Sequence, residues 1–115
     1  MSRLIDFSAL NEMLYGDDKY IKEFAEAAVI SFSEFNTNYA KYLAARDEEN
    51  FRRAGHKIKP VAQMLGLEQL IDEYENGKTL IWEEKPENEL LKSIKKIEGI
   101  SSQILNDLDS LISEH

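Results

Sequence analysis

The chain has 115 residues, enough for one domain, and its 43% hydrophobic and 31% charged residues are typical of a globular protein. It contains no cysteine, which excludes disulfides and thiolate metal sites and agrees with a reducing cytoplasm. Its net charge of −8 argues against nucleic-acid binding, because affinity for a phosphate backbone depends on clustered cations. The chain has no apolar run of the ~18 residues that a membrane span needs, and its start lacks a secretory signal. These features predict a small cytoplasmic domain whose partners are proteins, not nucleic acids or membranes.

Apolar residues follow a helical spacing along nearly the whole chain, which has only 5 glycines and 2 prolines. A short first helix is expected over residues 8–15, ended by Gly16. A second helix is expected over residues 18–45, with Asp17 or Asp18 as its N-terminal cap. Its apolar stripe contains Ile21, Ala25, Ala28, Phe32, Phe35, Tyr39 and Tyr42.

Three further helices follow. The third is capped by Asp47 and ends near Gly66. The fourth covers residues 67–75 and stops at the Asn-Gly dipeptide 76–77, a typical turn sequence. The last helix has Pro86 in its first turn. Its apolar face contains Leu90, Ile94, Ile97, Ile104, Leu108 and Leu111.

Amphipathic helices of this length must bury their apolar stripes against each other. The sequence therefore predicts an all-α fold, an up-down four-helix bundle with a short extra N-terminal helix, in which residues 1–115 form a single domain. We find no alternation of apolar and polar residues that would indicate strands.

The third helix carries the only internal histidine, His56. An advance of ~100° per residue places His56 opposite the core-facing arc and therefore on the outside of the helix. The arc consists of Phe51, Ala54, Ile58, Ala62 and Leu65. Arg52, Lys59, Pro60 and Gln63 share the side of His56, and Arg53 lies at its edge.

These neighbours indicate a chemistry for His56. Nearby cations disfavour the imidazolium and so leave a ring nitrogen available as a nucleophile. The same cations can pair with the oxygens of an incoming phosphoryl group. Metal binding is less well supported, because the other histidine is the C-terminal His115 and carboxylates are absent from this face. The plainer interpretation is a surface histidine on a solvated face rich in Arg and Lys.

Pro60 has no N–H and cannot donate the helical hydrogen bond to the carbonyl of His56. We expect the helix to bend or loosen there, at a cost of about 3 kcal/mol if nothing compensates. The proline either shapes an accessible surface beside the imidazole or is a tolerated kink without a role. The sequence favours neither interpretation.

The stretch RRAGHKIKPVAQMLGLEQL resembles the signature of histidine phosphotransfer (HPt) domains, an Ala-His-x-Leu-Lys-Gly core followed by a Leu-Gly step. His56 falls on the phosphorylated histidine and Lys59 on the lysine three residues on. The upstream stretch GDDKYIKEF resembles the family's entry into its second helix. Two residues depart from the pattern: Gly55 replaces the usual alanine and Pro60 the usual glycine. Counting along the chain places Lys78 near the position on the next helix where the family often has a glutamine that assists the site.

The resemblance implies a phosphocarrier in a two-component phosphorelay. A receiver-domain phospho-aspartate would pass its phosphoryl group to His56, which would pass it to another receiver aspartate. The implied partners are response-regulator receiver domains and a hybrid sensor kinase. The receivers would supply the Mg²⁺, so the chain itself would need no cofactor or metal and would not be an enzyme. Carriers of this type are usually monomeric.

The resemblance also implies roles for neighbouring residues. Lys59 would neutralise phosphoryl charge, with Arg52, Arg53 and Gln63 as helpers. Pro60 would lie where a receiver docks closely. Ile30 projects away from the core stripe of the second helix and is a candidate apolar contact for a receiver, although a stray surface isoleucine explains it more simply.

Three alternatives stay open. A sensor-kinase dimerisation helix would need an acidic residue after the histidine, a proline at the fifth position after it and glycine-rich ATP-binding segments. A non-phosphorylated adaptor could dock receivers through the same face, although the presence of both His56 and Lys59 argues against it. An unrelated helical binding module is the third. The methionine start and the complete set of helices favour a free-standing protein.

Overall fold

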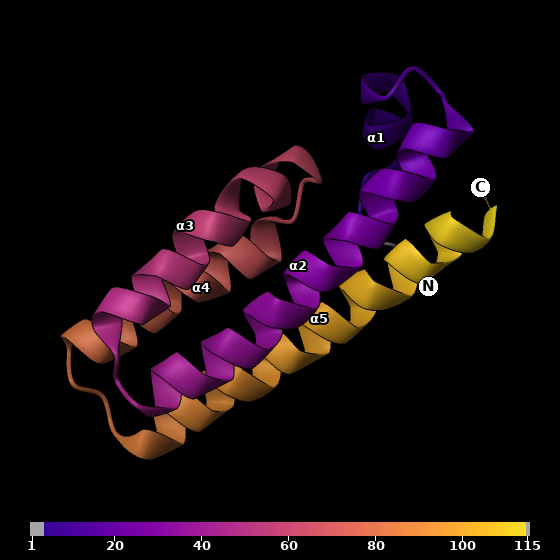
Figure 1. The fold of residues 1–115 in the computed structure, drawn as a ribbon. Helices are drawn as coiled ribbons and strands as arrows, with labels where there is room; N and C mark the ends of the chain where they lie inside the picture. The colour runs from indigo at the N-terminus through magenta and orange to yellow at the C-terminus, as the bar shows by residue number, and fades with distance from the viewer. Residues whose placement is uncertain (1–3, 115) are drawn as a thin grey trace.

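The computed structural model describes residues 4–114, which contain five helices and no strand. The helices are α1 (Phe7–Met13), α2 (Asp18–Ala44), α3 (Glu48–Met64), α4 (Glu68–Trp82) and α5 (Glu87–Glu114). Helices α2 to α5 run alternately up and down, and each packs on its chain neighbour while α2 and α5 close the bundle (Figure 1). The predicted all-α bundle is confirmed.

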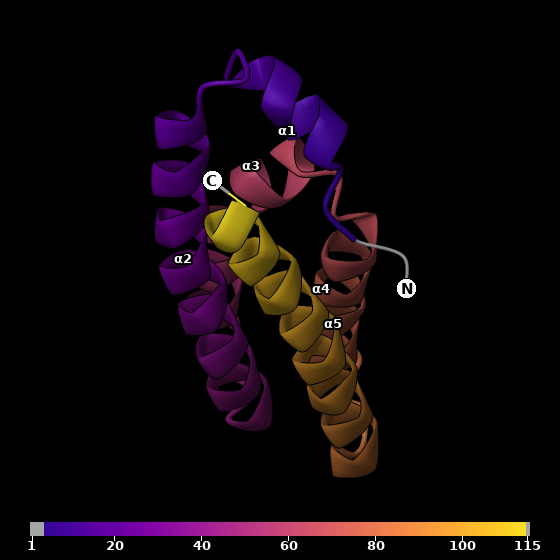
Figure 2. The same ribbon diagram turned by 90° about the vertical axis from the view of Figure 1, so that its right-hand side faces the viewer.

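The short helix α1 lies across one end of the bundle (Figure 2). The backbone N–H groups of Leu4 and Ile5 donate to Oδ2 of Asp107 on α5, at 2.8 and 3.3 Å. The backbone N–H of Asp6 donates to the carbonyl of Leu65 at the end of α3, at 3.4 Å. These hydrogen bonds attach the N-terminal segment to two helices of the bundle.

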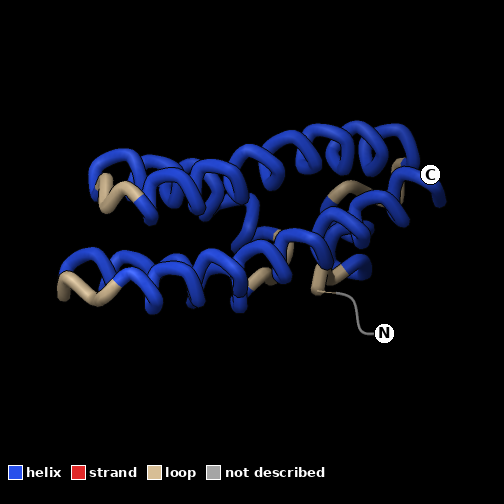
Figure 3. The backbone as a smooth tube through the Cα atoms, turned by 90° about the horizontal axis from the view of Figure 1, so that it is seen from below, coloured by secondary structure: helices blue, strands red, loops and turns tan. Residues whose placement is uncertain are grey.

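Short loops join the helices (Figure 3), and the predicted caps form. Oδ1 of Asp17 accepts from the N–H groups of Lys19 and Tyr20, and Oδ1 of Asp47 accepts from that of Asn50. Pro86 lies just before α5 rather than in its first turn. Its carbonyl accepts from the N–H of Glu89 at 2.9 Å.

The predicted end of the fourth helix is wrong, because α4 continues through residues 76–77 to Trp82. Gly77 is buried at a close approach of helices. A Cβ there would lie 2.6 Å from Cζ of Phe51 and 2.7 Å from the hydroxyl of Tyr39. Asn76 donates its side-chain amide to Oε2 of Glu73, at 2.9 Å. Tertiary packing thus overrides the turn preference of the Asn-Gly pair.

The predicted apolar stripes form the core, with changes at their edges. Tyr42, Ala54 and Ile94 are only half-buried, while Leu43, Gly55 and Ile100 are buried. Two of these changes move the buried position by a single residue. A helix turns by ~100° per residue, so positions at the border of a stripe are the ones that periodicity places least well.

Helices α3 and α4 approach most closely where the ring of Tyr74 covers Gly55. A Cβ on Gly55 would lie 1.9 Å from Cζ of Tyr74. The ring has little room to move, because it stacks on Phe51 at 5.2 Å between centroids and its hydroxyl donates to the carbonyl of Arg52 at 3.2 Å. Gly55 is therefore required by Tyr74 in this packing.

A buried polar network links α2, α4 and α5. The hydroxyl of Tyr39 lies 2.6 Å from Oγ of Ser93 and 2.9 Å from the carbonyl of Glu73, and Ser93 donates to Oε2 of Glu73 at 2.6 Å. The buried carboxylate of Glu73 pairs with Lys96, whose Nζ lies 3.2 Å from Oε1. Burial raises the pKa of Tyr39 well above its ordinary value of 10.0.

We predict that Gly55→Ala lowers the free energy of unfolding by about 1–3 kcal/mol, the usual cost of overpacking. Gly99→Ala is the matched control, because Gly99 lies inside α5 with no atom near the position of a Cβ. It should stabilise the protein by about 0.5–1 kcal/mol. Chemical denaturation measures both, and a second change, Tyr74→Leu, should recover part of the loss. A Gly55→Ala protein as stable as wild type would contradict the packing.

We also predict that Tyr39 makes stability sensitive to alkaline pH. Its pKa is raised in the folded state, so its contribution is complete below pH 10 and is lost as the pH rises above that value, where the unfolded tyrosine ionises. At neutral pH, Tyr39→Phe should cost about 1 kcal/mol through lost hydrogen bonds.

Denaturation of wild type and Tyr39→Phe between about pH 8 and pH 11 should therefore show a stability gap that narrows at the alkaline end. The exposed Tyr20 provides the control variant, Tyr20→Phe, which should leave the pH dependence unchanged. A gap that stays constant across this range would contradict the prediction.

Candidate functional site

His56 lies on the exposed side of α3, as the helical spacing predicted. Arg52, Arg53, Pro60 and Gln63 are exposed as well, and Lys59 is half-buried. The turns between Arg52 and Gln63 thus present the predicted residues on one side of a single helix. A partner can reach the imidazole without any rearrangement of the fold.

Helix α3 remains helical through Pro60 and ends only at Met64. The bend or loosening that we expected does not interrupt the helix. Because Pro60 has no N–H, the carbonyl of His56 lacks its usual helical donor. The carbonyl of Arg52, which is the helical acceptor for His56, also accepts from the hydroxyl of Tyr74. Both backbone groups of His56 therefore differ from those of an ordinary helical residue.

Carboxylates balance the cations around His56. Nε of Arg52 lies 3.3 Å from Oε1 of Glu48, and a terminal nitrogen of Arg53 lies 3.2 Å from Oε1 of Glu49. Nζ of Lys57 lies 3.4 Å from Oε2 of Glu34 on α2. The sequence had indicated that carboxylates avoid the face of His56, and this is wrong because Glu48 reaches it from the preceding turn and Glu75 reaches it from α4.

The most connected carboxylate belongs to Glu75 of α4. Its Oε1 lies 3.7 Å from Nζ of Lys59, and its Oε2 lies 2.7 Å from Nζ of Lys78. The hydrogen bond from Lys78 is the main cause that lowers the pKa of Glu75, and the charges of Lys78 and Lys59 add to it. Glu75 is thus a bridging anion between two lysines on two helices.

Gly77 of α4 lies against Phe51 and Tyr74 lies against Gly55, so Lys78 is level with the turn of α3 that precedes His56. It shares an open groove of about 330 Å³ with Arg52, one turn before His56. Its partner Glu75 contacts Lys59, almost one turn after His56. Lys78 is therefore linked to Arg52 through the groove and to Lys59 through Glu75. The groove is lined by Arg52, Lys78, Thr79, Glu83 and the exposed Trp82.

The sequence interpretation missed Tyr74 and Glu75. The available signal was the pair Glu75 and Lys78, which is an i,i+3 ion pair if residues 75–78 are helical. The expected stop at residues 76–77 concealed this pair. The position of Tyr74 opposite Gly55 depends on how the two helices align, which periodicity does not provide.

Ile30 of α2 is 63% exposed, as expected. It lies one turn before Glu34, which pairs with Lys57 of α3. Ile30 therefore belongs to the α2–α3 side of the molecule, whereas Glu75 and Lys78 lie on the α3–α4 side. Its contact with a receiver stays a prediction.

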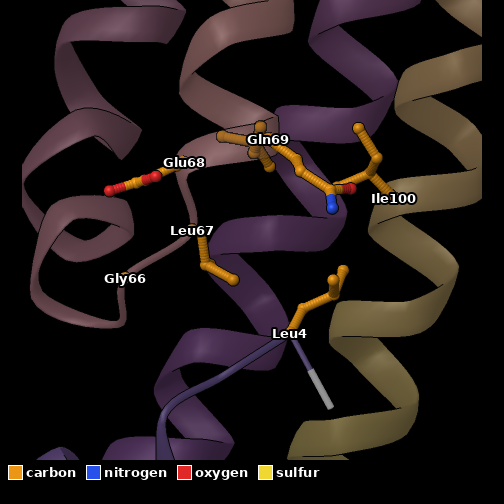
Figure 4. A pocket seen from close by; sticks show the side chains of 7 residues that line it. Leu4, Gly66, Leu67, Glu68, Gln69 and Ile100 are labelled. Carbon is orange, nitrogen blue, oxygen red and sulfur yellow. The ribbon is translucent and has the colours of Figure 1, made fainter. Parts of the chain in front are cut away.

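A second hollow lies away from these residues, near the start of α4 (Figure 4). It has a volume of about 310 Å³ and is lined by Leu4, Gly66, Leu67, Glu68, Gln69, Leu70 and Ile100. It contains no titratable group other than Glu68. None of the predicted site residues lines it.

Two further findings concern residues 4–114. They contain no cluster of three or more histidine or acidic side chains placed to hold a metal ion, and His115 lies outside them. None of their helices combines the length and the low polarity that crossing a bilayer requires.

Comparisons with protein-family models, curated proteins and solved structures found no match to this chain. The resemblance to HPt domains therefore depends on the residues around His56 and on the helical layout.

Proposed function

We propose that this chain is a histidine-containing phosphocarrier of the HPt type, which accepts a phosphoryl group from a receiver-domain aspartate onto His56 and passes it to another receiver aspartate. The observation that carries the proposal is an exposed imidazole on a bundle helix, followed after almost one turn by Lys59, which Glu75 links to Lys78 of α4. The proposed partners are response-regulator receiver domains and a hybrid sensor kinase. The carrier would act in the cytoplasm as a monomer.

The proposed transfer is a simple substitution at phosphorus. A lone pair on one ring nitrogen of His56 attacks the aspartyl phosphate, so an N–P bond forms while the acyl O–P bond breaks and the aspartate leaves as a carboxylate. The other ring nitrogen keeps its proton, which exchanges with water because the ring is exposed. The Mg²⁺ belongs to the receiver, and this chain contributes the nucleophile and the cations.

Lys59 is the cation best suited to pair with the transferred group, since it follows His56 by almost one helical turn. Its ion pair with Glu75 is long at 3.7 Å, and both side chains are partly exposed. Such pairs are typically worth about 0–1 kcal/mol, so exchanging Glu75 for a phosphoryl group costs little. Arg52, Arg53 and Gln63 remain proposed helpers.

A second candidate is an adaptor that docks receivers without being phosphorylated. The observation in its favour is that Arg52, Arg53, Lys57 and Lys59 each already pair with a carboxylate. A surface of balanced charge can dock a partner without any chemistry. Ile30 and Trp82 offer exposed apolar contacts for such docking.

Phosphorylated receiver domains provide the test. We expect acid-labile, base-stable label on wild type that disappears in His56→Gln. Because the second histidine, His115, remains in that variant, loss of the label would assign it to His56. Lys59→Ala should slow transfer about tenfold or more, since a charge-assisted hydrogen bond is worth about 1.5–3 kcal/mol. Lys57→Ala is the matched control, because Lys57 pairs with Glu34 on the other side of α3 and should leave transfer nearly unchanged.

The outcomes separate the candidates. Receivers that bind while wild type never acquires label would support the adaptor and end the carrier proposal. Label acquired from ATP alone would instead support an autophosphorylating kinase domain.

A further inference from the structure

Glu75 forms ion pairs with two lysines on two different helices. Its two oxygens contact different ammonium groups, Lys59 of α3 and Lys78 of α4. Lys59 and Glu75 have side chains that are 40% and 43% exposed, while that of Lys78 is 26% exposed. Because Lys59 follows His56 by almost one helical turn, the place that Glu75 occupies between Lys59 and Lys78 suits a second anion.

We propose that Glu75 is an internal counter-ion that holds Lys59 and Lys78 in the unphosphorylated protein and releases them to the phosphoryl group on His56. The inference rests on the proposed function, because it concerns the same histidine. It adds a positioning residue on α4 that controls how readily the group is accepted and how long it stays. Glu75 would not itself touch the reacting atoms.

Charge favours the exchange. A phosphoryl group carries about −1.5 to −2 charges and three acceptor oxygens, whereas the carboxylate of Glu75 carries one charge. The group can therefore attract both lysines more strongly than Glu75 does. Once it is present, the nearby carboxylate repels it, and this repulsion opposes retention of the phosphoryl group.

Packing lowers the free-energy cost of separating Lys78 from Glu75. Nζ of Lys78 lies 5.2 Å from the centroid of the Tyr74 ring, which the close contact with Gly55 and the stacking on Phe51 hold in place. Lys78 therefore keeps a second favourable contact when Glu75 moves away. Glu75 is half exposed, so its carboxylate can turn into water.

The test compares Glu75→Gln with wild type, using phosphoramidate as a small phosphoryl donor so that no receiver contact contributes. We expect the variant to acquire label on His56 about two- to fivefold faster and to lose it more slowly, as the loss of one partly exposed opposing charge would predict. Glu48→Gln is the matched control, because Glu48 is also 43% exposed and pairs with Arg52 on the same side of α3. It should change both rates less than Glu75→Gln does.

A second measurement does not require phosphorylation. Titration with inorganic phosphate, followed by the NMR signals of the lysine ammonium groups, should shift Lys59 and Lys78 more in Glu75→Gln than in wild type or Glu48→Gln. Lys57 should remain unaffected in all three proteins. This pattern would support a cation pair that Glu75 occupies.

The results separate the inference from the function on which it rests. If wild type is labelled but Glu75→Gln behaves as Glu48→Gln does in both experiments, the role of Glu75 is wrong while the carrier stands. If wild type is never labelled by donor or receiver but phosphate still binds better to Glu75→Gln, the carrier is wrong while the counter-ion remains. If neither label nor enhanced phosphate binding appears, both proposals fail.

Discussion

The close contact between Gly55 and Tyr74 is the constraint on which the arrangement around His56 depends. A Cβ at Gly55 would overlap the ring, so only glycine lets α4 approach α3 this closely. The ring is fixed by its stacking on Phe51 and its hydrogen bond to the carbonyl of Arg52. These two contacts set the alignment of α3 and α4 along their axes. This alignment brings Glu75 within reach of Lys59, while Glu75 also pairs with Lys78. The residue next to Gly55 is His56, so this contact lies beside the histidine and aligns Glu75 and Lys78 of α4 with α3.

The structure explains one of the two departures from the HPt pattern and not the other. Gly55, where the family usually has alanine, is explained by the aromatic ring that covers it, because the smaller residue and the larger neighbour compensate each other. Pro60 is exposed and lies within a helix that continues past it. Nothing in the structure explains why a proline stands there.

Much of the fold was predictable from the sequence, because helix ends and apolar stripes depend on local features. Asp17 and Asp47 cap helices as expected, and the outward direction of His56 follows from helical rotation alone. The errors arose where one helix meets another. The Asn-Gly pair at 76–77 has a local preference for a turn, but the space beside Phe51 and Tyr39 can accommodate only a glycine, and α4 continues. The carboxylate of Glu75 was missed for the same reason, since periodicity within a helix does not determine its alignment with a neighbour.

The balance of charge around His56 suits a carrier better than it would suit a storage site. A protein that only stored a phosphoryl group would gain from unpaired cations, since each would stabilise the phosphorylated state further. A carrier has to release the group as readily as it accepts it, and binding the carried state too tightly slows the second transfer. On the proposed mechanism, the ion pair between Lys59 and Glu75 limits how strongly the phosphoryl group is held. The energy of breaking this pair offsets part of the gain from pairing Lys59 with the phosphoryl group. On the proposed mechanism, each such pair would reduce the strength with which the phosphoryl group is held by about 0–1 kcal/mol, which would favour release to the second receiver.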